Sequence, residues 1–152
     1  MTTTSAPYAM PTRSRPPDLL VDTSVVVALV VADHEHHAAT LEAVGARRLG
    51  LAGHAAFETF SVLTRLPPPA RRTPETVAEV ITANFPENRY LSERATGQLF
   101  ARLAAAGIAG GSVYDALVGA TAAQHGIVLA TRDRRALETY RALDVEVEIL
   151  GG

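Results

Sequence analysis

The stretch SVYDALVGATAAQHGIVLATRD, residues 112–133, decides the fold of this chain. Its first part, Ser112–His125, has helical character, and Gly126 is a typical helix stop. The run Ile127–Ala130 is short, apolar and β-prone, so we expect a buried strand. Asp133 follows just beyond that strand. A helix that leads through glycine into a buried strand is the repeating unit of a parallel α/β sheet.

The same alternation extends through the rest of the chain. Further short strands are expected at Leu19–Val21, Arg48–Ala52, Asn88–Leu91 and Val145–Leu150. Further helices are expected directly after Asp22-Thr23-Ser24, at 33–46 with Asp33 as N-cap, at His54–Leu66, from Pro74 to before Pro86, at Ser92–Ala106 and at Arg134–Leu143. Alternating elements of these lengths predict an α/β fold with a central parallel sheet flanked by helices.

The chain has 152 residues, 47% of them apolar, which is enough for one domain with a substantial core. Residues 1–17 are rich in Pro, Thr and Ser and are predicted to be a disordered arm, followed by a single domain at 18–150. No apolar run approaches the roughly 20 residues that span a membrane, and the start lacks the apolar stretch of a signal peptide. We therefore expect a cytoplasmic protein without a membrane partner.

Two residue types are absent, and their absence excludes several classes of function. All 14 basic residues are arginine, so P-loop nucleotide hydrolysis and pyridoxal-phosphate chemistry, which need a lysine, are disfavoured. Without cysteine there is no disulfide, zinc–thiolate site or thiol nucleophile. The net charge of −2 provides no overall field for nucleic acid. Any such contact must come from local arginine groups, at 47–48, 71–72 and 132–135.

Four carboxylates stand where chemistry could use them. Asp22 and Asp133 follow predicted strands, at the sheet edge where open α/β proteins bind ligands. Glu58 lies in an otherwise apolar helix, and Asp115 lies in the first turn of another, near its positive dipole end. Such carboxylates would repel one another without a cation, and oxygen ligands suit Mg²⁺ or Mn²⁺.

Each acid also has a structural interpretation. Asp22 and Asp133 can cap the helices that follow them. Asp115 can complete a capping box with Ser112, and Glu58 can pair with Arg65, two turns along the helix. The four acids together favour the functional interpretation more strongly than any one of them does.

The segments LLVDTSVVVALV, HAAFETFSVLTRLP, SVYDALVGATAAQHGIVLATRD and RALDVEVEIL follow one another as the motifs of PIN domains do. Over residues 18–150 the chain resembles this family, and in particular the VapC-type toxins of actinobacteria. The resemblance implies an α/β/α sandwich with the acids gathered at one end of a parallel sheet. One departure is Leu137, which stands where the family often has an aromatic residue.

The resemblance also implies a function. It assigns Asp22, Glu58, Asp115 and Asp133 as the catalytic, metal-binding acids, with Thr131 beside them and Ser24 as a second supporting hydroxyl. The implied activity is a Mg²⁺- or Mn²⁺-dependent endoribonuclease, the toxin of a toxin–antitoxin pair. The implied partners are an RNA substrate, a VapB-like antitoxin that can place a basic side chain among the acids, and a second copy in a homodimer.

Other interpretations stay open at this point. The fold can serve as a non-catalytic module that binds RNA or protein, or as a DNA-directed, structure-specific nuclease, because nothing in the sequence reads a 2′-hydroxyl. The tract His34, His36 and His37 resembles a metal-binding run but can simply face solvent at a helix start. His54 and His125 lack the serine or cysteine motif that a general base would serve. The apolar surplus in helices 54–66 and 92–106 indicates either self-association or ordinary packing.

Overall fold

Four short parallel strands form the centre of the molecule in a computed structural model that describes residues 16–151. The strands are β1 (Leu19–Val21), β2 (Leu49–Leu51), β3 (Leu129–Thr131) and β4 (Val147–Ile149), in the order β2-β1-β3-β4. In register, Leu20 of β1 lies opposite Gly50 of β2 and Leu129 of β3. Because all strands are parallel, their carboxyl ends meet at one edge of the sheet, and β1 lies between β2 and β3.

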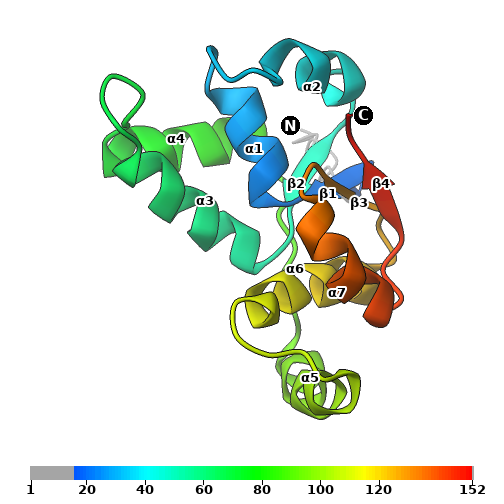
Figure 1. The fold of residues 1–152 in the computed structure, drawn as a ribbon. Coiled ribbons are helices and arrows are strands. Elements are labelled where there is room, and N and C mark those ends of the chain that lie inside the picture. The colour runs from blue at the N-terminus through cyan, green and yellow to red at the C-terminus, as the bar shows by residue number, and fades with distance from the viewer. Residues whose placement is uncertain (1–15, 152) are drawn as a thin grey trace, which may run out of the picture.

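Helices connect the strands and cover the sheet. They are α1 (Thr23–Val30), α2 (His37–Val44), α3 (His54–Arg65), α4 (Pro74–Asn84), α5 (Glu93–Ala106), α6 (Ser112–His125), the 3₁₀ turn η1 (Arg134–Ala136) and α7 (Leu137–Ala142). Helix α1 packs against α2 and α3, and α6 packs against α5 and α7. Figure 1 shows α1 to α4 on one side of the sheet and α5 to α7 on the other. The predicted α/β class with a central parallel sheet flanked by helices is therefore confirmed.

Local sequence signals explain the helix boundaries that were predicted correctly. Thr73 and Ser92 are N-caps whose side-chain oxygens accept hydrogen bonds from Thr76 N and Ala95 N. Gly107 and Gly126 end α5 and α6 in the left-handed conformation, with φ of 67° and 63°. These caps and stops confirm the helices predicted at 74–85, 92–106 and 112–125.

The strands predicted at Ile127–Ala130 and Val145–Leu150 are Leu129–Thr131 and Val147–Ile149 in the structure, and three further predicted elements were wrong in their bounds. The helix predicted at 33–46 begins only at His37, because residues 31–36 form turns in which His34 N bonds to Val31 O, and Asp33 caps nothing. The strand predicted at Asn88–Leu91 is reduced to one bridge between Ala52 and Arg89. The helix predicted at Arg134–Leu143 is divided into η1 and α7.

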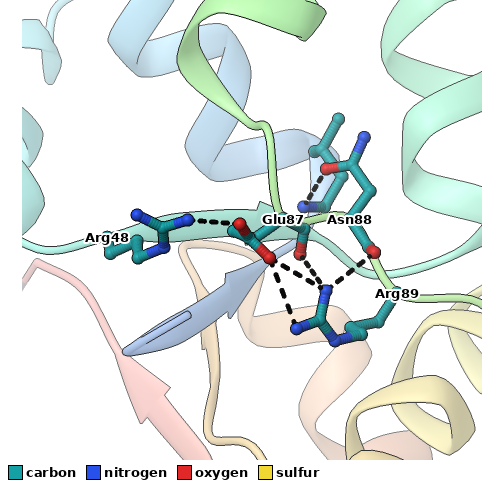
Figure 2. Close-up of polar contacts among 5 residues, drawn as sticks. Arg48, Glu87, Asn88 and Arg89 are labelled. Atoms are coloured by element: carbon teal, nitrogen blue, oxygen red, sulfur yellow. Dashed lines mark hydrogen bonds and ion pairs between the residues drawn. The ribbon is translucent and has the colours of Figure 1, made fainter. Parts of the chain in front are cut away.

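The segment Glu87–Arg89 covers the outer edge of β2 in place of a fifth strand. Asn88 Oδ1 accepts a hydrogen bond from Leu51 N at 2.7 Å, and the Glu87 carboxylate is bonded by both Arg48 and Arg89 (Figure 2). The backbone approach requires glycine in the strand, since a Cβ at Gly50 would lie 2.2 Å from Glu87 O. A strand edge that would otherwise be open to pairing with another chain is thus covered.

The core lies on both faces of the sheet and is closed by α1, α3, α6 and α7. Leu20, Val21, Leu129 and Tyr140 are among its largest fully buried side chains. Pro17 is also buried, whereas residues 1–15 of the predicted arm lie outside the described part of the chain. Within residues 16–151, no helix has the length and hydrophobicity to cross a membrane.

Candidate active site

Asp22 lies at the carboxyl end of β1, where it is also the N-cap of α1. Asp22 is only 6% exposed, and its carboxylate accepts four hydrogen bonds. Ser24 Oγ donates to Oδ1 at 2.5 Å and Val25 N to the same oxygen at 3.4 Å. Thr131 Oγ1 donates to Oδ2 at 2.5 Å and the Tyr140 hydroxyl at 3.0 Å. All four donors are neutral, so within residues 16–151 hydrogen bonds satisfy this carboxylate without a cationic side chain bonded to it.

The hydroxyls of Ser24 and Thr131 are themselves oriented by the backbone after β3. Arg132 N donates to Ser24 Oγ at 2.9 Å, and Asp133 N donates to Thr131 Oγ1 at 3.0 Å. Each hydroxyl therefore accepts from a backbone N–H and donates its own proton to Asp22. Such chains polarise each bond in turn and fix the direction of the hydroxyl protons. The loop after β3 thus holds the acid that follows β1.

Burial and neighbouring groups shift two pKa values in this cluster. Burial raises the pKa of the Asp22 carboxyl, and the hydrogen bonds from Ser24, Thr131, Tyr140 and Val25 oppose that rise. Burial, followed by the charge of Asp22, raises the pKa of the Tyr140 phenol. Tyr140 consequently keeps its proton at any physiological pH and is a permanent donor to Asp22.

The other three predicted acids lie around Asp22 on separate elements. Asp115 is on α6, Glu58 is on the exposed face of α3, and Asp133 is the N-cap of η1. Burial, followed by the charges of Asp133, Glu58 and Asp22 in that order, raises the pKa of Asp115 to about 6. The four acids are thus close enough for their charges to act on one another, although they come from four distant segments.

The donor set fits a hard divalent cation in its chemistry. Carboxylate and hydroxyl oxygens are the ligands that Mg²⁺ and Mn²⁺ prefer, and Asp115 is destabilised by the negative charge around it. Within residues 16–151, however, no three His, Cys, Asp or Glu side chains lie close enough together to hold one ion. Direct binding by three acids therefore requires side-chain rotation. Asp22 is held by its hydrogen bonds, whereas Glu58 is exposed and Asp115 and Asp133 are partly exposed.

An open basin of about 500 Å³ lies beside the acids. Its walls carry Ser24, Glu58 and Asp133 together with Arg132, Arg134 and Arg135. The Arg135 guanidinium lies 3.4 Å from the Asp133 carboxylate and is almost fully exposed. The basin thus combines acids with cationic side chains that are suited to phosphate groups.

The structure also decides between the alternatives for single residues. Asp22 and Asp133 do cap the elements that follow them, in addition to lying at the cluster. The capping box at Ser112 is wrong, because Gly111 is the N-cap and makes no side-chain cap. The pairing of Glu58 with Arg65 is also wrong, since neither side chain contributes to an ion pair among the described residues.

The histidines do not form a metal site in the described part of the chain. His34 and His36 line the far wall of the basin, and His37 Nδ1 lies 2.9 Å from Ala28 O. His54 stacks on Tyr114 with ring centroids 4.9 Å apart.

Sequence reasoning missed Tyr140 altogether. The only sequence signal for it is a polar-tipped aromatic residue in a short helix of mixed apolar and charged residues, where a tyrosine is an ordinary core residue.

Comparison with known proteins agrees with this geometry. The sequence model of the PIN domain family matches residues 19–142. Ribonuclease VapC27 of Mycobacterium tuberculosis is 47% identical over 133 residues, which cover 88% of this chain and 97% of that protein. Ribonuclease VapC40 of the same organism is 47% identical over 131 residues, covering 85% and 96%. The crystal structure of FitAcB from Neisseria gonorrhoeae superposes with a TM-score of 0.59 at 20% identity, covering 85% of this chain and 95% of that one.

Proposed function

Because the chain belongs to the PIN domain family, we propose that it is a metal-dependent endoribonuclease that acts as the toxin of a toxin–antitoxin pair. The ribonuclease relatives at 47% identity, aligned over nearly their whole length, support the activity and its RNA substrate. The observation that carries the proposal is that Asp133, Glu58 and Asp22 lie near enough to Asp115 for their charges to add to the effect of burial and raise its pKa to about 6. Such a cluster is costly for folding alone, which favours a functional role.

In this proposal the four acids hold Mg²⁺ or Mn²⁺ at the carboxyl ends of β1 and β3. The ion, when bound, supplies an acidified water and neutralises charge that develops on the scissile phosphate. Ser24 and Thr131 both donate to the Asp22 carboxylate, so they orient it and oppose the rise of its pKa that burial causes. Arg132, Arg134 and Arg135 line the basin in which the RNA backbone would lie. Attack by water predicts products with a 5′-phosphate and a 3′-hydroxyl.

The test is cleavage of total bacterial RNA by purified, antitoxin-free protein in Mg²⁺, in Mn²⁺ and in EDTA. We expect cuts at a few discrete sites that need metal and fall at least about 100-fold in Asp22→Asn. Asp33→Asn, an exposed acid that caps nothing, is the matched control and should cleave normally. A folded protein that binds Mn²⁺ but cuts no RNA would instead favour a binding module, and cuts in DNA alone would favour a DNA-directed nuclease.

We also propose a VapB-like antitoxin as the protein partner. The acid cluster is a natural receptor for an arginine or lysine side chain, because all four donors to Asp22 are neutral. Such a side chain would compensate the charge that a metal ion otherwise compensates. Co-expression with a candidate VapB-like protein should relieve growth arrest and block RNA cleavage. Toxicity that persists beside every candidate antitoxin would contradict this assignment.

A homodimer is the third part of the proposal. It is supported by the exposure of Phe57 of α3 and Phe100 of α5, which are 68% and 71% exposed and would be covered by a second copy. Light scattering after size exclusion should give twice the chain mass, and Phe100→Glu should shift it toward the monomer. A monomeric wild-type protein at micromolar concentration would remove this part of the proposal.

A further inference from the structure

The position of the Tyr140 side chain is fixed by the packing between α6 and α7. Its residue is 1% exposed, and its ring lies against Gly119 of α6. A Cβ at Gly119 would lie 2.9 Å from Tyr140 Cδ1 and 3.0 Å from Val145 Cγ2. Any residue larger than glycine would therefore displace the Tyr140 ring. This packing directs the phenol toward Asp22, and the Tyr140 hydroxyl donates a 3.0 Å hydrogen bond to the Asp22 carboxylate. The same helix, α6, carries Asp115.

The two oxygens of Asp22 are not equivalent. A carboxylate oxygen accepts about two hydrogen bonds, one along each lone pair. Oδ2 accepts from Thr131 at 2.5 Å and from Tyr140 at 3.0 Å, so both directions are filled by good bonds. Oδ1 accepts from Ser24 at 2.5 Å, but its second donor, Val25 N, is at 3.4 Å and contributes weakly. Oδ1 is therefore the oxygen with capacity for a further, stronger bond.

We propose that Tyr140 is a positioning residue: with Thr131 it holds Oδ2 of Asp22, so that Oδ1 is the oxygen presented to a divalent cation. The proposal rests on the function proposed above and deepens it. The Tyr140 ring is packed closely at Gly119, and its hydroxyl donates to Oδ2 at 3.0 Å, so it fixes the plane of the carboxylate. Without it, Oδ2 retains one donor, the carboxylate is free to turn, and part of the binding energy is lost in ordering it. Partners that orient a metal ligand typically change metal affinity by about 10- to 100-fold.

The experiment measures Mn²⁺ affinity by titration calorimetry on the full-length protein without RNA. Tyr140→Phe removes one oxygen and keeps the ring that fills the core. We expect its Kd for Mn²⁺ to rise about tenfold above that of the wild type. Tyr90→Phe is the matched control, because Tyr90 is 51% exposed, and its Kd should stay within about twofold of wild type. Gly119→Ala, which displaces the ring and keeps the hydroxyl, should also raise the Kd.

A melting curve in EDTA separates positioning from mere packing. If Tyr140→Phe lowers the metal-free melting temperature but binds Mn²⁺ with the wild-type Kd, Tyr140 is only a core residue and the proposal is overturned. If Tyr140→Phe fails to fold, Gly119→Ala decides, and a wild-type Kd in that variant overturns the proposal. A wild-type protein that binds no Mn²⁺ would refute the proposed metal-dependent function itself, so the two failures are distinct.

Discussion

Two buried carboxylates in this molecule have opposite surroundings. Asp22, 6% exposed, receives hydrogen bonds only from neutral donors, and burial raises its pKa. Glu87, 8% exposed, is bonded by two arginines, and the hydrogen bond from Arg48 lowers its pKa, helped by the charges of Arg48 and Arg89. Figure 2 shows both guanidinium groups turned toward Glu87.

The difference separates an acid whose charge is compensated within the described chain from an acid that is open to a partner. Arg48 and Arg89 compensate the charge of Glu87 within the chain, and the cluster fastens the segment after α4 to the edge of β2. In the part of the chain that the structure describes, no cationic side chain is bonded to Asp22, although four groups orient its oxygens. A buried carboxylate that is oriented but not neutralised is suited to a partner from outside the chain, either a metal ion or a basic side chain.

The largest effect expected from this comparison is on stabilisation by metal. Mn²⁺ at about 100 times its Kd should stabilise the wild-type protein by about 2.7 kcal/mol, because it binds only the folded state. For a chain of this size that corresponds to a rise of roughly 5–10 °C in the melting temperature. Asp22→Asn should lose nearly all of this rise, whereas Glu87→Gln should keep it. Differential scanning calorimetry in Mn²⁺ and in EDTA measures both.

The contrast between Asp22 and Glu87 does not hold if Mn²⁺ raises the melting temperature of both variants equally. A full Mn²⁺-dependent rise in Asp22→Asn would place the metal elsewhere in the molecule. Loss of the rise in Glu87→Gln would mean that the Glu87 cluster is coupled to metal binding, and the distinction between the two acids would not hold. Circular dichroism of both variants at 20 °C checks that each is folded before heating.

Much of this fold was predictable because its signals are local. Pro74 at a helix start, Ser92 as an N-cap and the glycines at 107 and 126 act within a few residues, and each fixed one boundary correctly. The segment 87–89 was not predictable as a loop on β2. What decides it is the contact of Glu87 with Arg48, 39 residues away, together with the close approach to Gly50.

The candidate site likewise has parts that local sequence signals predict and parts that depend on contacts between distant residues. Asp22 and Asp133 could be placed from strand ends, because parallel strands share an edge. The hydrogen bond from Tyr140 to Asp22 could not, since it joins residues 118 positions apart through the packing of α7 on α6. The sequence therefore predicted candidates for the reacting groups, while the residue that orients one of them required the three-dimensional packing.

A second, smaller effect concerns Asp115. Its pKa is raised from 3.8 to about 6, so the folded state is penalised when this group ionises. The stability linked to it is fully present below pH 3.8 and is lost as the pH rises through about 6. In EDTA at pH 8, Asp115→Asn should therefore stabilise the protein by about 1 kcal/mol, after allowance for solvent screening of a partly exposed group. Urea denaturation at pH 8 and pH 4 measures the difference.

The same substitution should act in the opposite direction on function. Asp115→Asn removes a proposed metal-binding acid, so RNA cleavage should fall even though the metal-free protein becomes more stable. A gain in stability that is equal at pH 4 and pH 8 would contradict the electrostatic origin of the effect. Asp33→Asn, at an exposed acid that caps nothing, is the control and should show neither the gain nor the loss.

The smallest effect expected is at Glu87, where charge is already compensated. Its pKa is lowered, so its stabilising contribution is present above about pH 4.5 and is lost as the pH falls through the folded-state pKa, below 4.5. Glu87→Gln keeps the size of the side chain and one acceptor for Arg48, and it loses only the charge. We expect a lower melting temperature than wild type at pH 7, and a difference that shrinks toward pH 3.5. Because the Arg48 side chain is 39% exposed, 1 M salt should shrink it as well. If the difference in melting temperature between wild type and Glu87→Gln changes with neither pH nor salt, Glu87 acts through packing at the β2 edge. Compensation of its charge is then not what distinguishes it from Asp22.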